Sequence, residues 1–281
     1  MRARPAAATL FAMSSVATNT IELHYELTGS GETVVLVHGG WSDRNNWRPV
    51  VPGLAESFEV VAVDRRGHGL SARGVQGTRR DQEDDLAALI ESLGGEPVNL
   101  VGTSFGGSIA IGLASRRPEL VRALIAHEPP LIGLVADNPD VGPELQSVQA
   151  SMGAVLARID EGDAEGAARQ FVEEIALGPG SWEALPPPLR ATMVDSAPAL
   201  ILEQRDEDWA DIDRAALAAI DRPLVLTQGD QSPAWFRSIV TELPNAVEAA
   251  EIHTYRGAGH APHLTHPSAW LSHVKDSLTA K

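Results

Sequence analysis

The 281-residue sequence contains no cysteine. A catalytic thiol, a cysteine-ligated zinc site, an iron–sulfur cluster and stabilising disulfides are therefore all excluded. A chain of this length buries enough apolar surface to form one large domain without such cross-links. The stability of the fold and any chemistry must come from other side chains.

Long apolar runs and an excess of positive charge are also missing. No segment approaches the roughly 18 apolar residues of a membrane-spanning helix. Against 38 Asp and Glu stand only 22 Lys and Arg, which gives a formal net charge of −16. That balance disfavours binding to nucleic acid or to an anionic membrane surface through charge. We expect a cytoplasmic protein with neither kind of partner.

The N-terminal segment is basic and weakly apolar. In MRARPAAATLFAMSSVA, two arginines precede a short apolar run that Pro5 interrupts. A secretory signal combines a basic start with a longer apolar stretch, so the match to one is weak. We expect residues 1–18 to form a flexible tail.

Several short segments are almost continuously apolar, as strands buried on both faces must be. They are residues 33–40, 58–64, 97–104, 121–128 and 222–230. Helical patterns separate them, and this alternation predicts a mostly parallel sheet covered by helices. Before them, IELHYELTG alternates apolar and polar residues, which is typical of an antiparallel edge strand.

The alternation stops after Pro130. From about residue 141 to residue 220, apolar residues recur at helical spacing, and the strand pattern returns at Pro223. We therefore interpret residues 129–215 as a helical insertion, a cap, on an α/β core formed by residues 19–128 and 216–281.

One motif indicates a nucleophile. VNLVGTSFGG places Gly102, Ser104 and Gly106 in G-x-S-x-G spacing between a buried strand and a helix. A nucleophile elbow requires this context, because its tight turn needs the glycines and holds the serine hydroxyl clear of the sheet. The helix that begins at Phe105 also presents free backbone N–H groups to a developing oxyanion. An ordinary glycine-rich turn is the alternative.

A serine needs a base, and histidine, with a reference pKa of about 6.5, is the usual one. In TYRGAGHAPHLTHP, His260 follows a strand pattern and a glycine-rich turn. His260, His263 and His266 also form a row that resembles a metal motif, but Pro262 and Pro267 interrupt any helix that would align them. We expect no metal.

Two further features of the sequence concern the approach of the backbone to a bound group and the binding of cofactors. The segment VLVHGG ends a strand in Gly39 and Gly40, where the backbone can approach a bound group closely. A dinucleotide-binding G-x-G-x-x-G and a phosphate-binding P-loop are both absent from the sequence. We therefore expect no nicotinamide, flavin or nucleotide cofactor.

Together these motifs resemble the α/β-hydrolase superfamily. VHGG, DRRGHGLS, GTSFGG, TQGDQSP and GAGHAPHLTHP occur in the superfamily's order over almost the whole chain. The resemblance implies an eight-stranded sheet, Ser104 as nucleophile and His260 as general base. It also implies that the backbone N–H groups of Gly40 and Phe105 form the oxyanion hole.

The superfamily completes the site with a catalytic triad, whose third member is an acid that orients the histidine. In this chain the position of the acid departs from the usual pattern. The superfamily's usual acid position after the seventh strand is Ser232. Some members, such as those similar to zearalenone lactonase, take the acid from the end of the sixth strand, where this chain has Glu128. A buried glutamate there needs a partner, and the His260 Nδ1–H would supply one. Asp230, which we interpret as a turn residue, is the alternative acid.

The predicted activity is hydrolysis of a carboxylic ester or lactone of an apolar small molecule through an acyl-enzyme. Perhydrolase or haloperoxidase activity and C–C bond hydrolysis use the same triad, and a non-catalytic small-molecule receptor is an alternative of another class. We expect the pocket between cap and core to be lined by Trp41, Trp182, Trp209, Leu131, Ile132 and Met152.

Overall fold

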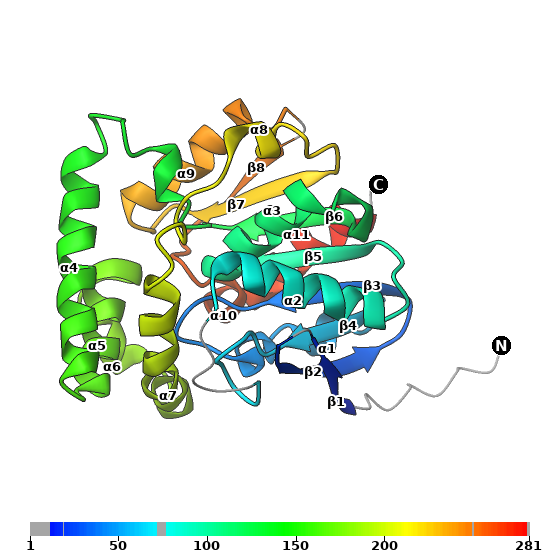
Figure 1. The fold of residues 1–281 in the computed structure, drawn as a ribbon, viewed down its shortest axis with the longest axis horizontal. Coiled ribbons are helices and arrows are strands. Elements are labelled where there is room, and N and C mark those ends of the chain that lie inside the picture. Colours follow the sequence, from blue (N-terminus) through cyan, green and yellow to red (C-terminus); the bar gives the residue numbers. More distant parts are fainter. Residues whose placement is uncertain (1–11, 19, 72–76, 249, 280–281) are drawn as a thin grey trace.

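The computed structural model describes residues 12–18, 20–71, 77–248 and 250–279. Its centre is an eight-stranded sheet of order β1-β2-β4-β3-β5-β6-β7-β8 (Figure 1). The strands are β1 (Ala12–Ala17), β2 (Glu22–Gly29), β3 (Glu32–Val37), β4 (Phe58–Val63), β5 (Val98–Thr103), β6 (Val121–His127), β7 (Leu224–Gly229) and β8 (Ala250–Tyr255). From β4 to β8 all pairs are parallel, whereas β1 and β2 are antiparallel to their neighbours. The predicted mostly parallel sheet is confirmed.

The N-terminal part corrects two predictions. Residues 1–11 of the expected flexible tail lie outside the described residues, but Ala12–Ala17 form β1 and pair with β2. Consequently β2, although antiparallel as predicted, is not the edge strand. The segment AMSSVA has two adjacent serines and mostly exposed side chains, so it lacks the alternating or continuous apolar pattern that predicts a strand.

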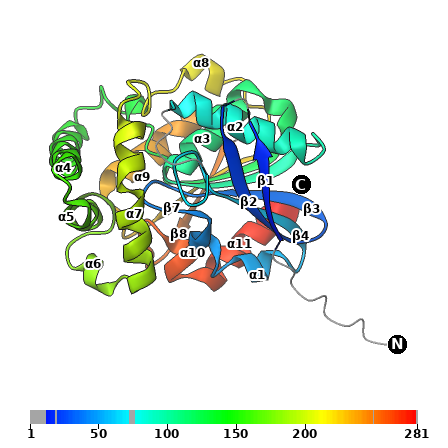
Figure 2. The same cartoon turned by 60° about the horizontal axis from the view of Figure 1, so that its bottom comes forward.

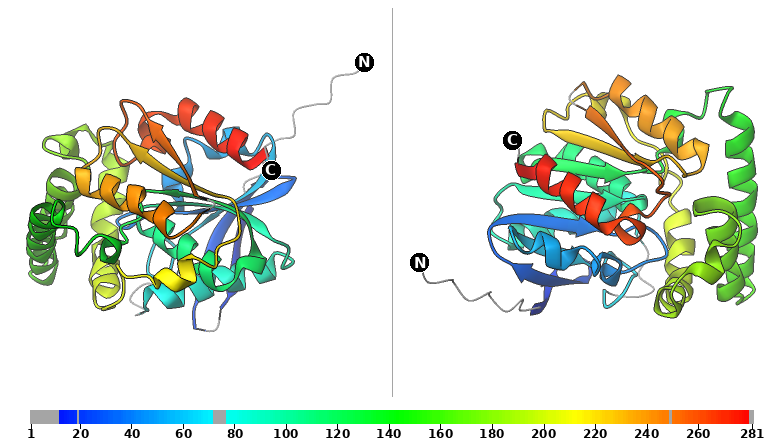
Figure 3. Two further views of the ribbon diagram at one scale, coloured as in Figure 1. Left: turned by 90° about the horizontal axis from the view of Figure 1, so that it is seen from above. Right: turned by 180° about the vertical axis from the view of Figure 1, so that it is seen from behind.

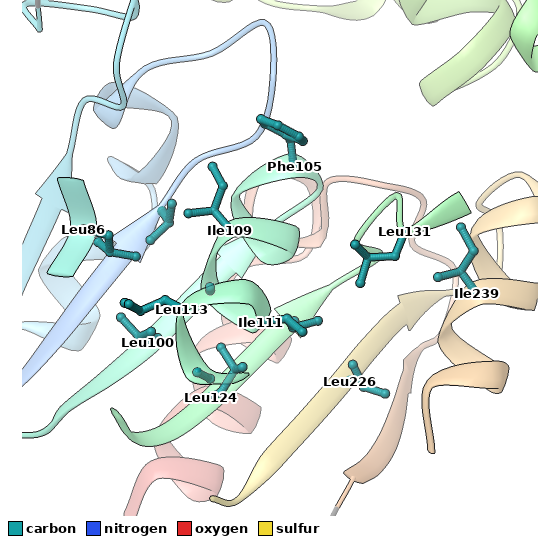
Figure 4. Packing of buried hydrophobic residues seen from close by; sticks show 14 of the residues in the cluster. Leu86, Leu100, Phe105, Ile109, Ile111, Leu113, Leu124, Leu131, Leu226 and Ile239 are labelled. Carbon is teal, nitrogen blue, oxygen red and sulfur yellow. The ribbon is translucent and has the colours of Figure 1, made fainter. Parts of the chain in front are cut away.

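Side chains of successive residues in the central strands enter opposite layers of the core, which explains their continuous apolar sequence. In β3, Val35 and Val37 pack in one layer with α2 (Arg79–Ser92) and α3 (Phe105–Arg116). Val34 and Leu36 pack in the other layer. Figure 4 shows the first layer, where Leu100 and Leu124 of the sheet lie against Leu113 of α3.

Other helices complete the two layers. Apolar residues of α1, α10 and α11 or their flanking segments cover the second face, as Figure 3 shows for α11. The remaining core helices are η1 (Arg44–Trp47), α1 (Val51–Leu54), η2 (Pro118–Leu120), α8 (Arg214–Leu217), α9 (Ala234–Glu242), η5 (Leu243–Asn245), α10 (Pro262–Thr265) and α11 (Pro267–Thr279).

Between β6 and β7 the chain is helical, and most of this segment lies beyond one end of the sheet (Figures 1 and 2). Its elements before α8 are η3 (Ile132–Leu134), α4 (Gly142–Asp160), α5 (Ala164–Gln170), a π-helical turn (Phe171–Ala176), α6 (Ser181–Ala184) and α7 (Pro187–Gln204). By contrast, α8 contacts α3 of the core, and its Leu217 is fully buried. No helix in the described ranges is long and apolar enough to span a membrane.

Candidate active site

Ser104 lies at a strained turn between β5 and α3. Its φ of 52° is a left-handed value that a non-glycine residue adopts at a cost. The turn is tight: a Cβ atom on Gly102 would lie 2.5 Å from the carbonyl oxygen of Gly106, and one on Gly106 would lie 2.3 Å from that of Val37. The two flanking glycines are therefore sterically required, and the local geometry is that of a nucleophile elbow.

Glu128 and His260 meet although 132 residues separate them in sequence. His260 Nδ1 lies 2.6 Å from Glu128 Oε2, and the other carboxylate oxygen accepts the backbone N–H of Gly229 at 2.7 Å. Glu128 is completely buried, while the ring of His260 is mostly buried and stacks on Phe236 at 4.2 Å between centroids. The structure thus brings together the predicted base and the favoured acid.

The electrostatics of this pair hold the carboxylate in its charged form. Burial by itself raises the pKa of Glu128, but neighbouring His127, which gains a proton at low pH, and the hydrogen bond from His260 outweigh burial and lower it to about 2. Conversely, burial lowers the pKa of His127 to about 4. Near neutral pH, Glu128 is therefore an anion beside a neutral His127, and it can stabilise a positive charge on His260.

Asp230 and Ser232, the two residues at or near the usual acid position, have other surroundings. Asp230 Oδ1 accepts the backbone N–H of Gly257 at 2.7 Å, which is the role of a turn residue. Ser232 is buried and close enough to Glu128 to contribute to the low pKa of that carboxyl, but its hydroxyl is not aligned for a hydrogen bond to a described residue.

A two-glycine segment adjoins the serine. A Cβ atom on Gly39 would lie 3.0 Å from Ser104 Cβ, and within the described residues the Gly40 N–H has no acceptor. Phe105 opens α3, so its N–H has no acceptor within the helix. Arg65 Nη2 donates to the Gly39 carbonyl at 2.9 Å and holds the segment. Both N–H groups that the resemblance singled out are free for a ligand.

Beside Ser104 lies a cavity of about 470 Å³. Ser104, Gly40 and Phe105 line it, together with four of the six predicted pocket residues, namely Trp41, Ile132, Met152 and Trp209. Apolar and aromatic side chains dominate the lining, which is typical of a small-molecule site.

Two predicted pocket residues do not line this cavity. Leu131 is completely buried in the core, where it lies near Ile111 (Figure 4). Trp182 is 2% exposed and packs within the helical segment, with the Arg190 guanidinium 5.8 Å from its ring. Their tertiary neighbours, which no local pattern specifies, turn both side chains away from the cavity.

Sequence reasoning missed several lining residues. Phe171, Trp235 and Phe236 contribute aromatic surface, and Glu203 contributes a buried carboxylate. Trp235 and Phe236 stand just after the turn that carries Asp230, so their proximity to the triad strand was a usable signal. No motif or spacing in the sequence indicated that Glu203, in the acidic segment at the end of α7, lines the cavity.

His263 and His266, two histidines of the row that resembles a metal motif, each lie beside a polar side chain. His263 Nε2 lies 3.0 Å from Asn46 Nδ2, and His266 Nδ1 lies 2.9 Å from the hydroxyl of Thr265. Another set, His127, Glu128 and His260, has ligand atoms within 4.8 Å of one another. There, however, the Glu128–His260 contact is a hydrogen bond, and a metal would have to displace its proton.

Comparisons with known proteins identify the family of the chain. The model of a family described as "Alpha/beta hydrolase family" matches residues 34–274. The uncharacterized hydrolase YraK of Bacillus subtilis is 38% identical over 119 residues, which are 41% of this chain and 44% of that protein. The matches to the first curated relatives thus span less than half of their length.

Two comparisons extend over most of the chain. A putative non-heme chloroperoxidase of Synechocystis is 27% identical over 88% of this chain and 91% of its own. The solved structure of an enol-lactonase from Burkholderia xenovorans superimposes with a TM-score of 0.75, covering 95% of this chain and 100% of that one at 21% identity. The latter likeness concerns the fold alone.

Proposed function

Because the chain belongs to the alpha/beta hydrolase family, we propose that it is a serine hydrolase that cleaves a carboxylic ester or lactone of an apolar small molecule. The observation that carries this proposal is the combination of a strained Ser104 on the cavity wall with a buried Glu128–His260 pair. This combination supplies a nucleophile, a base and a group that stabilises the protonated base.

The proposed reaction has two steps. His260 Nε2 accepts the proton of the Ser104 hydroxyl while Oγ attacks the substrate carbonyl, and the N–H groups of Gly40 and Phe105 bind the tetrahedral oxyanion. The protonated His260 then gives its proton to the leaving alcohol, and an acyl-enzyme remains. Water attacks this ester with the same histidine as base, releases the acid and restores Ser104.

The helical segment between β6 and β7 has the role of a cap in this proposal. Residues of α4 and α7, among them Met152, Leu156 and Leu200, line the same cavity as Ser104. They supply the apolar surface on which the body of the substrate rests. The cap therefore sets which esters or lactones fit, whereas the core performs the acyl transfer.

A fluorophosphonate probe tests the proposal. We expect it to label the wild-type protein but not Ser104→Ala, and we expect an activated ester such as para-nitrophenyl acetate to give an acyl-enzyme burst. A folded wild-type protein that the probe does not label would contradict the hydrolase proposal. Labelling without turnover of any ester or lactone would instead favour the non-catalytic receptor.

Cofactor-free haloperoxidase activity is a second candidate. The similarity to the Synechocystis chloroperoxidase over nearly its whole length favours it. The same acyl-enzyme would react with hydrogen peroxide in place of water and give a peracid, which oxidises halide. Bromination of a dye that requires acetate, peroxide and Ser104 would support this activity, and its absence in a protein that hydrolyses esters would exclude it.

A further inference from the structure

Glu203 of α7 is a carboxylate that the triad mechanism does not use. It is 6% exposed, yet it lines the same cavity as Ser104. Its Oε1 atom accepts Arg65 Nη1 at 2.6 Å and lies 3.1 Å from His68 Nε2. No donor in the described part of the chain binds Oε2, so this acceptor of a cavity-lining residue is available to a ligand.

Contacts at two neighbouring glycines show where this oxygen lies relative to Ser104. A Cβ atom on Gly40 would lie 3.8 Å from Glu203 Oε2, and one on Gly39 would lie 3.6 Å from Ser104 Oγ. Glu203 Oε2 therefore lies beside Gly40, the proposed oxyanion donor, and Gly39, the preceding residue, lies beside the serine. A group bound there would belong to a substituent close to the scissile carbonyl.

Glu203 is a negatively charged carboxylate near neutral pH. Burial raises the pKa of this carboxyl, but the Arg65 guanidinium outweighs burial and lowers the pKa to about 2. As a carboxylate, Glu203 can only accept hydrogen bonds. An unpartnered acceptor in an apolar cavity costs free energy that a ligand donor recovers.

The other charged residues that line the cavity are acidic as well. Among the described residues around the cavity there is no lysine, arginine or histidine, whereas Glu207 and Asp211 are present as exposed side chains. Arg65, the partner of Glu203, lies behind it and is itself 3% exposed. The cavity therefore has acceptors and negative charge to offer a ligand, and no cation for a substrate carboxylate.

Resting on the proposed esterase activity, we infer that Glu203 is a specificity-determining residue whose Oε2 binds a hydrogen-bond donor on the substrate, a hydroxyl or ammonium group next to the scissile carbonyl. The substrate class is an ester or lactone with an apolar body and such a donor, without a carboxylate. Aromatic side chains such as Trp41 and Phe171 receive the apolar body.

Four methyl esters of equal shape test this inference. Methyl phenyllactate carries a hydroxyl beside the ester carbonyl, the methyl ester of phenylalanine carries an ammonium group at mildly acidic pH, and monomethyl benzylmalonate carries a carboxylate. The fourth ester has a methyl group at that position. Each is measured as a competitor of para-nitrophenyl acetate hydrolysis, and the readout is the ratio of their inhibition constants.

We expect the hydroxyl and ammonium esters to compete at concentrations about tenfold lower than the methyl ester, and the carboxylate ester at concentrations about tenfold higher. In Glu203→Gln the ammonium advantage should be lost, and the carboxylate ester should improve because Arg65 is left unpaired. Glu165→Gln, a matched change at an exposed residue of α5 outside the cavity lining, should leave the ratios within about twofold of wild type.

Equal inhibition by all four esters in the wild-type protein would overturn the inference, even if Glu203→Gln fails to fold. Unchanged ratios in a folded Glu203→Gln variant would overturn it as well, since a purely structural ion pair does not affect selectivity. Failure of the proposed function looks different: para-nitrophenyl acetate would then show no hydrolysis that depends on Ser104.

Discussion

Gly229, the last residue of β7, donates its backbone N–H to the carboxylate of Glu128 at 2.7 Å. The strand that would carry the acid in the superfamily's usual arrangement thus holds Glu128, the proposed acid of the neighbouring strand, in place. With its other oxygen committed to His260, Glu128 has a fixed orientation, which His260 requires in its proposed role as base to Ser104.

The first prediction concerns the acid. Glu128→Gln should lower kcat by about 10²-fold or more, because an amide cannot stabilise the protonated His260 and can favour the wrong tautomer. Asp230→Asn should change kcat by less than about threefold, since Asp230 binds the Gly257 N–H instead. Steady-state kinetics at matched folding stability decide this. A large loss in Asp230→Asn alone would reverse the assignment.

The second prediction concerns the turn at Ser104. Gly106→Ala should reduce the free energy of unfolding by about 1 to 3 kcal/mol, because its Cβ would overlap the Val37 carbonyl at 2.3 Å. The control is Gly153→Ala in α4, where no atom lies within 4 Å. There the helix should gain roughly 0.5 to 1 kcal/mol. Urea unfolding measures both, and equal effects would contradict the steric argument.

The third prediction separates the two tryptophans of the helical segment. Trp209 lines the cavity, whereas Trp182 is packed away from it. Trp209→Leu should raise KM for an apolar ester by about tenfold with little loss of stability. Trp182→Leu should lower stability by about 2 kcal/mol or more and leave KM near that of wild type. The reverse pattern would mean that Trp182 contacts the substrate.

The fourth prediction is that acid weakens the fold through His127. Its folded pKa of about 4 is below the ordinary value of 6.5 because of burial, which the nearby Glu128 charge offsets only in part. Between these two values the unfolded chain binds a proton that the folded chain does not. Stability is therefore complete above about pH 6.5 and declines as the pH falls to about 4, by roughly 2 kcal/mol at about pH 5.

Urea unfolding of wild type and His127→Asn, each near pH 8 and near pH 5, checks this linkage. The variant should lose part of the pH dependence, because asparagine has no proton to gain in this range. His273, whose pKa of about 4 is set by burial and by neighbours other than His127, contributes equally to both proteins and cancels in the difference. Identical pH dependence in the two proteins would show that His127 does not titrate as described.

The sequence identified the parts of the site that local pattern determines. A serine between two glycines, placed between a buried strand and a helix, is typical of a nucleophile elbow, so Ser104 was predictable from this spacing and its context together. Glu128 was predictable because a glutamate at the tip of a buried strand requires a partner. The partner of Glu203 belongs to a loop about 138 residues away, and no periodicity encodes such a distance.

The same limit explains the errors. Trp182 and Leu131 are apolar, as pocket residues usually are, but which face of a helix or turn between β6 and β7 meets the cavity depends on packing between helices. Likewise, β1 is short, and only its pairing with β2 makes it a strand. Local sequence patterns did not predict elements whose structure depends on one partner that is distant in the sequence.

Three non-glycine residues of the described chain have positive φ values, namely Trp41 (57°), Ser104 (52°) and Glu128 (42°), and all three lie at the candidate site. Each such conformation costs of order 1 kcal/mol or more. The proposed function gives a reason for this cost in stability, and Ser104→Gly should yield a more stable but inactive protein. Screens for thermostable variants will tend to select against the nucleophile unless activity is scored as well.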